Sequence, residues 1–371
     1  MKNKSVCIAF LGNISFDTRT LNFYKSLKEK GYAVEVICFE WKGNKTAGLP
    51  PNVKIYTLNK KKSSIFFYAK FAYKLFINLL KSKAGVFFAE DIYTLPFVCI
   101  AAKFKNAKVI YDSRELFGFL AGLKSRRALQ KMLASIEKRF IGLANNVIVT
   151  GDMDGEFLHE QYGIANLITI RNLPFLDTAI KKNDLHSLYG IDENKKILVY
   201  QGVILHGRGL RYVFNYLKTY DESVLVVFGD GEQKKFYEDL AVSLGIQKKV
   251  IFAGKVPQEE LLAYSAGADI GLSLIENISL SYYFALPNKL FEYIMAGLPV
   301  IVSNLPQMKQ VIANYKVGAS VDIYKEEELN DSLHQIITNN DVLKEYRENC
   351  KKAALELNWN NEIKKLFDVL D

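Results

Sequence analysis

The stretch Leu286-Pro-Asn-Lys-Leu-Phe-Glu-Tyr-Ile-Met-Ala-Gly-Leu-Pro-Val-Ile-Val-Ser-Asn304 predicts a helix, a tight turn and a buried strand in succession. Pro287 suits the first helical turn, Gly297 stops the helix, and the apolar run after Pro299 is typical of a strand. Glu292 is the acid of this helix, so its carboxyl group must reach water or hold a partner. The unpaired N–H groups of the helix start, with Lys289 beside them, can receive a phosphate.

The alternation of strand and helix continues over residues 196–274, which predicts a parallel sheet. Glycines follow its strands in three turns: Gly202, Gly207 and Gly209, then Gly229 and Gly231, then Gly254. Two glycines after one strand are common in turns and indicate little alone. Three such turns in one sheet, with Arg208 in the first and Lys255 in the third, predict an anionic nucleotide along the carboxyl ends of the strands.

The first half of the chain opens with strands at residues 6–11 and 33–39 and a helix at about 20–30 between them, which is typical of a doubly wound sheet. Polar residues follow its strands, where such sheets bind ligands. Those that we assign to a candidate acceptor site are Gly12, Asn13, Asp17, Arg19, Asp91, Arg114 and Glu115. The charged residues among them also have a simpler interpretation as helix caps or local ion pairs, and both interpretations stay open.

The chain has 371 residues, 49% of them hydrophobic, which is enough for two α/β domains with separate cores. We place the first domain at residues 1–172, the second at 193–357, and a linker at 173–192. A final helix at about 358–371 is a candidate to pack back on the first domain. The four cysteines form no CxxC pair, and no apolar segment approaches the roughly 18 residues of a membrane span, so we expect a cytoplasmic protein.

Charge is distributed unevenly between the halves. Residues 1–172 hold 27 Lys and Arg against 13 Asp and Glu, whereas residues 173–371 hold 22 against 27. Two basic stretches of the first half, residues 60–83 and 117–141, also carry aromatic and aliphatic side chains. Such helices either pack on a core with a solvated basic face or lie on an anionic membrane surface, and the presence of two favours the membrane. We expect no nucleic acid, because the aromatic residues are spaced for a helix face rather than a base-stacking sheet.

Several motifs together resemble those of glycosyltransferase family 4. Besides residues 286–304, they are Tyr200-Gln-Gly-Val-Ile-Leu-His-Gly-Arg-Gly-Leu210, Phe228-Gly-Asp-Gly-Glu232 and, less closely, Tyr111-Asp-Ser-Arg-Glu-Leu116 and Arg171-Asn-Leu-Pro174. The resemblance implies the GT-B fold, an α/β architecture of two Rossmann-like, doubly wound parallel-sheet domains that face a cleft, with C-terminal helices. It also implies transfer of a sugar from a nucleotide diphosphate with retention at the anomeric carbon, without a metal ion or other cofactor.

Position by position, the resemblance implies that Glu292 holds the ribose hydroxyls as the second glutamate of an E-x7-E motif. Phe284 replaces the first glutamate, so the family's rule for the donor sugar does not apply to this chain. Arg208 matches the residue that grips the diphosphate, and Lys289 or Lys255 is a candidate for a second phosphate clamp. Catalytic roles thus fall to Arg208, Lys289 and Glu292, and donor contacts to Gly202, His206, Gly207, Gly209, Gly229, Gly231, Lys255, Val256, Phe284, Pro287, Asn288 and Leu290.

The leading hypothesis is a retaining glycosyltransferase on the inner face of the cell membrane. It would move a sugar from a nucleotide diphosphate sugar, with UDP favoured and GDP as the other option, to a lipid-linked saccharide in surface polysaccharide synthesis. Two alternatives stay open. A nucleotide-sugar epimerase of the same fold would turn over without an acceptor, and a non-catalytic subunit that binds sugar nucleotides would explain the missing carboxylate at Phe284.

Overall fold

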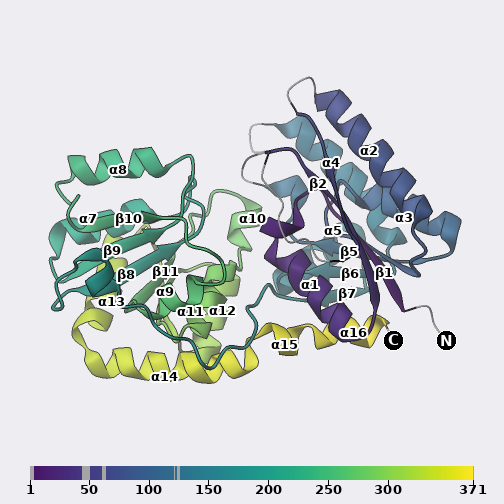
Figure 1. Cartoon of the computed structure of the whole chain (residues 1–371). Helices are drawn as coiled ribbons and strands as arrows, with labels where there is room; N and C mark the ends of the chain where they lie inside the picture. Colours follow the sequence, from purple (N-terminus) through teal and green to yellow (C-terminus); the bar gives the residue numbers. More distant parts are fainter. Residues whose placement is uncertain (1–3, 44–50, 61–63, 121, 123–125, 371) are drawn as a thin grey trace. The chain divides into compact units, whose positions relative to one another are not determined.

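The computed structural model describes residues 4–43, 51–60, 64–120, 122 and 126–370. The chain divides into two compact units, one formed by Met1–Arg171 with Ile363–Asp371 and the other by Asn172–Glu362. Each unit holds one β-sheet with helices packed around it (Figure 1). All strand pairings recorded for the described residues are parallel, which confirms the predicted class of two Rossmann-like domains.

The sheet of the first unit has seven strands in the order β3-β2-β1-β4-β5-β6-β7. They are β1 (Ser5–Ala9), β2 (Ala33–Glu40), β3 (Val53–Thr57), β4 (Val86–Ala89), β5 (Lys108–Ser113), β6 (Asn146–Val149) and β7 (Leu167–Thr169). The strand order reverses between β1 and β4, so the carboxyl ends of these two strands border the crevice in which doubly wound sheets bind ligands.

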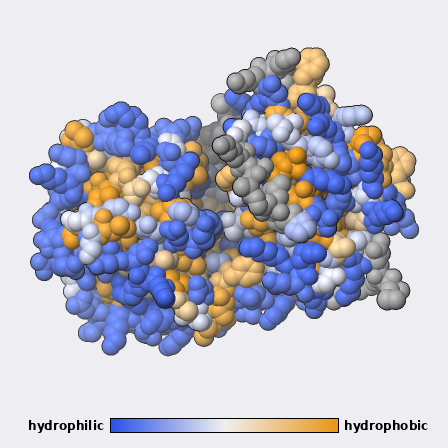
Figure 2. Space-filling model, viewed as in Figure 1, coloured by the Kyte–Doolittle hydropathy of each residue, from blue (hydrophilic) through white to orange (hydrophobic). Residues whose placement is uncertain are grey.

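The helices of the first unit are α1 (Thr18–Glu29), α2 (Ser64–Lys81), α3 (Leu95–Lys105), α4 (Arg127–Phe140), α5 (Asp152–Tyr162) and α16 (Lys364–Leu370). The helices α2, α3 and α4 lie next to one another on one face of the sheet, and α1 lies on the other (Figure 1). The helices α2 and α4 cover most of the two predicted basic stretches, whose residues 61–63, 121 and 123–125 lie outside the described residues. Hydrophobic residues interrupt the hydrophilic surface over α2 and α3 in Figure 2.

The sheet of the second unit has six strands in the order β10-β9-β8-β11-β12-β13. They are β8 (Lys196–Gln201), β9 (Ser223–Phe228), β10 (Val250–Gly254), β11 (Ile270–Ser273), β12 (Val300–Ser303) and β13 (Gly318–Val321). The helices of this unit are α6 (Leu185–Tyr189), α7 (Leu210–Thr219), α8 (Lys234–Ser243), α9 (Leu261–Ala266), α10 (Leu280–Tyr283), α11 (Asn288–Met295), α12 (Pro306–Tyr315), α13 (Glu326–Thr338), α14 (Asn340–Glu356) and α15 (Trp359–Glu362). The helix α11 and the strand β12 are the helix and strand expected within residues 286–304.

Two segments at the boundaries of the units have defined positions. Residues 173–192, where the sequence analysis places a linker, pack within the second unit, and Leu173 and Leu185 belong to its hydrophobic core. The end of the chain lies with the first unit, where Lys365 Nζ donates to the carbonyl oxygen of Thr169 over 3.0 Å. Residues 173–192 therefore do not form a separate linker, despite their polar composition. Apolar residues spaced along the segment are enough to pack it against the second unit.

Candidate functional site

The turns after β8 and β9 meet backbone to backbone at the carboxyl edge of the second sheet. A Cβ atom added to Gly229 would lie 1.9 Å from the carbonyl oxygen of Gly202, and one added to Gly231 would lie 2.3 Å from that of Ile204. Backbone atoms cannot move aside as a flexible side chain can, so neither position admits a side chain. The predicted glycines are therefore needed to bring the two loops together on one rim.

The turn that carries Arg208 is packed as tightly. Gly207 and Gly209, on either side of it, have φ angles of +79° and +70°, which favour glycine. Cβ atoms at these positions would lie 2.7 Å from Cδ1 of Ile278 and 2.5 Å from Cβ of Leu274. Contacts with the loop after β11 thus restrict the backbone conformation of this turn. That conformation sets the position of the Arg208 Cα atom.

Two basic side chains, Arg208 and Lys289, lie against neighbouring aromatic rings. The Arg208 Cζ atom is 5.1 Å from the centroid of the Tyr282 ring, and Lys289 Nζ is 3.7 Å from the centroid of the Tyr200 ring. The structure records no ion pair between either cation and the carboxylates that it describes. Burial and the Arg208 charge hold the pKa of Lys289 well below its usual range, and Glu292 opposes this shift only in part. An anion bound beside the two cations would therefore offset the repulsion between them.

Two glutamines hold the carboxylate of Glu292. Gln201, at the end of β8, donates to Glu292 Oε2, and Gln258 donates to Oε1 over 3.2 Å. Ser265 Oγ donates to Gln201 Oε1 over 2.6 Å, which fixes the orientation of that amide. Burial raises the pKa of Glu292, and the two glutamine hydrogen bonds act in the opposite direction. The carboxylate is thus oriented before any ligand binds and keeps lone pairs that can accept hydroxyl hydrogen bonds.

The other residues predicted to contact the donor differ in exposure. Gly202, His206, Lys255 and Asn288 are exposed, and Val256, Phe284 and Pro287 are half-buried. Lys255 Nζ lies 3.8 Å from Asp230 Oδ2, so its charge has a partner within the rim. Leu290 is completely buried in the hydrophobic core, which corrects its predicted role, because its side chain anchors α11 and cannot contact a ligand.

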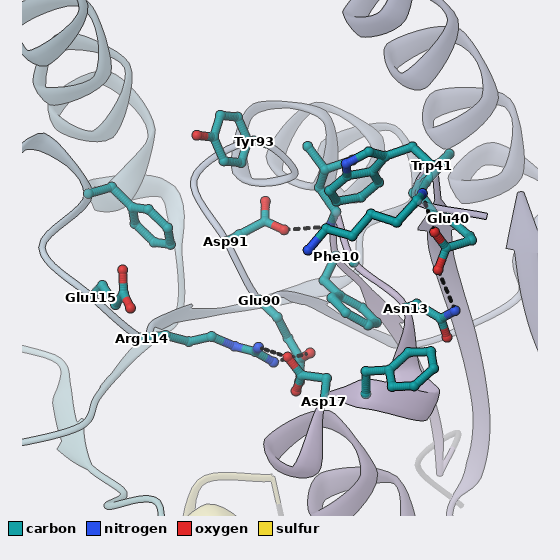
Figure 3. A pocket seen from close by; sticks show the side chains of 16 residues that line it. Phe10, Asn13, Asp17, Glu40, Trp41, Glu90, Asp91, Tyr93, Arg114 and Glu115 are labelled. Atoms are coloured by element: carbon teal, nitrogen blue, oxygen red, sulfur yellow. Dashed lines mark hydrogen bonds and ion pairs between the residues drawn. The ribbon is translucent and has the colours of Figure 1, made fainter. Parts of the chain in front are cut away.

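The first unit has a pocket of about 340 Å³ at the carboxyl edge of its sheet (Figure 3). Loops after β1, β2, β4 and β5 build it on both sides of the point where the strand order reverses. Its aromatic lining residues are Phe10, Phe16, Phe39, Trp41, Tyr93 and Phe117, and its charged ones are Asp17, Glu40, Lys42, Glu90, Asp91, Arg114 and Glu115. Gly12 and Asn13 complete the set of predicted acceptor residues that line it, whereas Arg19 does not.

Arg114 is the centre of an ion cluster below this pocket. Its Nη1 lies 2.6 Å from Asp17 Oδ2, its Nη2 2.6 Å from Glu90 Oε2, and its Nε 3.3 Å from Asp112 Oδ2 (Figure 3 draws the first two). Arg19 donates to both oxygens of Asp112, over 2.8 and 2.7 Å, and is 4% exposed. Arg19 therefore joins strand ends inside the unit, which corrects its predicted place on the acceptor side.

Two of the predicted acids bind backbone N–H groups while they line the pocket. Asp17 accepts from the backbone N–H of Thr20 over 2.8 Å. Asp91 accepts from the N–H groups of Leu11 and Thr94 over 2.5 and 2.8 Å. The simpler interpretation as a helix cap is therefore confirmed for Asp17, which begins α1, whereas Asp91 binds the turn before α3. Both roles are compatible with a ligand site, because both side chains also line the pocket.

Several residues of both regions lie outside the predicted site sets. Glu90 stands beside Asp91 at the end of β4, where the sequence predicts a rim of charged residues, but it is not among the residues assigned to the acceptor site. Gln201 ends β8 just before Gly202, so its position at a strand end could have identified it. Trp41 and Tyr93 carry no comparable signal, because an aromatic residue near a strand end is as typical of the core as of a binding site.

Some kinds of site are absent from the part of the chain that the structure describes. It has no group of three or more His, Cys, Asp or Glu side chains that could hold a metal ion. None of its helices is long and apolar enough to cross a bilayer. The four cysteines are all buried and free.

Comparison with known proteins places this geometry in context. Residues 181–356 match the family model for glycosyl transferases group 1. The uncharacterized glycosyltransferase MJ1607 of Methanocaldococcus jannaschii is 23% identical over 48% of this chain and 46% of its own length. The chitobiosyldiphosphodolichol beta-mannosyltransferase of Debaryomyces hansenii is 22% identical over 99% of this chain and 88% of its own length.

Solved structures share the fold over almost the whole chain. The sucrose-phosphate synthase of Thermosynechococcus elongatus has a TM-score of 0.82 at 15% identity, with 99% of this chain and 98% of its own covered. HepE of Anabaena, solved in complex with UDP and glucose, has a TM-score of 0.77 at 14% identity and 98% coverage of both chains. The chain is therefore a glycosyltransferase with the GT-B fold, and its residues 181–356 carry the similarity to glycosyl transferases group 1.

Proposed function

We propose that this enzyme moves a sugar from a nucleotide diphosphate sugar, with UDP favoured over GDP, to a saccharide acceptor with retention at the anomeric carbon. One observation carries the proposal: among the described residues, Arg208 and Lys289 have no recorded ion-pair partner, their charges act on each other, and the oriented carboxylate of Glu292 acts on Lys289. A diphosphate supplies the negative charge that these cations lack, and a ribose supplies hydroxyls for the carboxylate. HepE, a similar fold that holds UDP and glucose, supports this choice of donor.

The departure of the diphosphate defines what each side chain does in this proposal. Negative charge grows on the leaving phosphate as the bond to the sugar breaks. The Arg208 guanidinium and the Lys289 ammonium stabilise that charge where burial strengthens electrostatic interactions. Glu292 holds the ribose and so fixes the position of the phosphate chain. In the retaining reaction the leaving phosphate oxygen takes the proton of the acceptor hydroxyl, so the donor site needs no histidine base.

We further propose a lipid-linked acceptor, because α2 has two apolar faces. Its inner face consists of the buried residues Phe67, Phe71, Leu75 and Leu79. On its outer face Phe66, Tyr73 and Leu80 follow one another at intervals of seven residues and are 74%, 69% and 37% exposed. Lys70 and Lys81 are exposed on the same helix. An outer apolar stripe with lysines nearby suits the interface of an anionic bilayer, where each basic residue contributes about 1 kcal/mol.

The same helix supports the pocket of the first unit. The Trp41 ring lies 5.8 Å from that of Phe67, and the Tyr93 ring stacks on that of Tyr68 at 6.0 Å, both measured between centroids. A lipid held along α2 would therefore carry its saccharide close to the pocket. Assembly of a surface polysaccharide at the inner membrane face is the role that fits such an acceptor.

The donor and the reaction are tested with the purified chain. A thermal-shift screen of nucleotide sugars identifies the donor, because a bound ligand stabilises the folded state. We expect a UDP-sugar to raise the melting temperature, and that donor then to release UDP and extend a lipid-linked saccharide. Conversion of the donor to its epimer without an acceptor would replace the proposal by the epimerase. If the chain neither hydrolysed nor transferred the donor that it binds, a non-catalytic subunit would be the correct description.

Membrane binding is tested by flotation with vesicles that contain or lack anionic lipid. We expect the wild-type chain to float with anionic vesicles at low salt and to dissociate at high salt. The double variant Phe66→Ser/Tyr73→Ser should stay unbound. The control Phe236→Ser/Val242→Ser removes residues that are 54% and 63% exposed on α8 of the other unit, and should float like the wild type. Wild-type protein that fails to float at low salt would disprove the membrane part.

A further inference from the structure

The pocket of the first unit is acidic, although the sequence around it is basic. Five carboxyl groups line it, from Asp17, Glu40, Glu90, Asp91 and Glu115, against two cations, Lys42 and Arg114. Arg114 is already paired with Asp17 and donates a hydrogen bond to Glu90. A phosphate or carboxylate on a ligand would therefore meet more negative than positive charge here. The net positive charge of the first half of the chain therefore does not extend to this pocket.

All the hydrogen bonds around Glu90 can form together when its carboxyl group carries a proton. Glu90 Oε2 lies 2.5 Å from Thr20 Oγ1, and the same Oγ1 lies 2.8 Å from Asp17 Oδ1. Thr20 has one hydroxyl hydrogen and can donate only once. Both contacts are hydrogen bonds if Glu90 donates to Thr20 and Thr20 donates to Asp17. Glu90 is then a neutral acid.

The charges of the cluster agree with this assignment. Two guanidinium groups, of Arg19 and Arg114, face the carboxyl groups of Asp17, Asp112 and Glu90. With Glu90 neutral, two carboxylates balance two cations. Burial, together with the charges of Asp17 and Asp112 and against that of Arg114, raises the pKa of Glu90 to about 8.

One oxygen of Glu90 is left without a partner. Glu90 is completely buried and lines the pocket, and its Oε1 has no hydrogen bond among the described residues. A buried acceptor without a donor is unfavourable, and such groups are rare in folded proteins. A hydroxyl group of a bound molecule would supply the missing donor.

We propose that this pocket binds a sugar residue of the acceptor that carries no negative charge, a neutral or amino sugar, and excludes phosphorylated and uronic acid residues. The inference rests on the proposed function and narrows its acceptor. A hydroxyl of the sugar donates to Glu90 Oε1, and its C–H face lies against aromatic walls such as Trp41 and Tyr93, whose ring faces are electronegative. The acidic rim accepts further hydroxyl or ammonium hydrogens.

Trp41 makes the pocket observable without a donor or an enzymatic assay. The chain has two tryptophans, and the other, Trp359, is completely buried in the second unit. Fluorescence titrations compare methyl glucoside and glucosamine with glucuronate and glucose 6-phosphate at constant ionic strength. We expect saturable changes with the first two sugars and at least tenfold weaker binding of the two anionic ones. Trp41→Phe should abolish the signal.

Glu90→Gln and Glu90→Leu separate the role of the neutral acid from that of shape. We expect the glutamine variant, which keeps an acceptor oxygen and no charge, to bind methyl glucoside within threefold of the wild type, and the leucine variant at least tenfold more weakly. Anionic sugars that bind as tightly as neutral ones would overturn the inference, as would a leucine variant with unchanged affinity. If no sugar changes Trp41 fluorescence while nucleotide sugars still shift the melting temperature, the pocket assignment fails and the proposed transferase stands.

Discussion

Gln201 at the end of β8 donates its side-chain N–H to Oε2 of Glu292 on α11, although the two residues are 91 positions apart. The Ser265 hydroxyl group donates a hydrogen bond to the oxygen of the same amide. The position of the carboxylate thus depends on packing between a strand, a helix and the loop that carries Gln258, rather than on α11 alone. A glutamate in this setting can hold ribose hydroxyls without reorganising.

Glu292→Gln should weaken UDP binding by about 10- to 100-fold, which is the size of one hydrogen bond to a charged group. The substitution keeps the shape of the side chain and removes its charge, so the fold should persist. Isothermal titration calorimetry measures the dissociation constant. Glu345→Gln changes an exposed acid on α14 and is the matched control. Equal affinities of the two variants would contradict the assignment of Glu292 to the ribose.

Lys289 should take up a proton when a nucleotide diphosphate binds. Its pKa in the free protein is held well below the usual range by burial and by Arg208, so Lys289 is more readily neutral than an exposed lysine. A diphosphate beside Nζ favours the charged form and raises the pKa, and protons therefore move from the buffer to the protein.

Calorimetry of UDP binding in two buffers of different ionisation enthalpy measures this proton uptake. The uptake should be positive at pH 8 and should vanish in Lys289→Met, whose side chain has a similar length and no charge. Uptake that persists in that variant would assign the proton to another group.

The local features of the donor edge could be predicted from the sequence, because each has a local cause. Gly207 and Gly209 sit at positive φ, and Gly229 and Gly231 face backbone oxygens, so no other residue fits. The helix and strand within residues 286–304 follow from their own caps and periodicity. In each case the residues that determine the local structure lie within the same segment of the sequence.

Partners brought together by folding could not be predicted in the same way. The sequence allowed a local ion pair for Arg19, yet Arg19 pairs with Asp112, 93 positions away. The protonation of Glu90 depends on Thr20, which lies on another element. The edge strand β3 has five residues, all of them exposed or half-buried, and so lacks the continuous apolar run that predicts a buried strand. These features exist only after the sheet has formed.

Gly229→Ala should destabilise the second unit by about 1–3 kcal/mol, the usual cost of forcing extra volume into a packed site. The added methyl group would stand 1.9 Å from the carbonyl oxygen of Gly202, and the loops after β8 and β9 would have to separate. Nucleotide affinity should fall with stability, because the same loops form the donor rim. Thermal unfolding and UDP titration measure the two effects. Gly142→Ala, where nothing lies within 4 Å of the new atom, should change stability by less than about 0.5 kcal/mol. An unchanged melting temperature for Gly229→Ala would show that the loops can separate freely.

Glu90 should make the stability of the first unit fall as the pH rises. Its pKa is raised from 4.5 to about 8 by folding, so the folded protein keeps a proton that the unfolded chain loses. The stabilising contribution is complete below about pH 4.5 and is lost progressively up to about pH 8, with a slope of at most about 1.4 kcal/mol per pH unit.

Urea unfolding between pH 5 and pH 8, followed through Trp41 fluorescence, measures that slope. Glu90→Gln stays neutral throughout, so the free energy of unfolding of the wild type should decline relative to that of the variant as the pH rises. Glu156→Gln removes an exposed acid of the same unit on α5, and its curve should run parallel to that of the wild type. Parallel curves for the wild type and Glu90→Gln would mean that Glu90 is ionised in the folded state. The pocket would then carry one more negative charge and its rejection of anionic sugars would be stronger, but the proton shared with Thr20 and Asp17 would not exist.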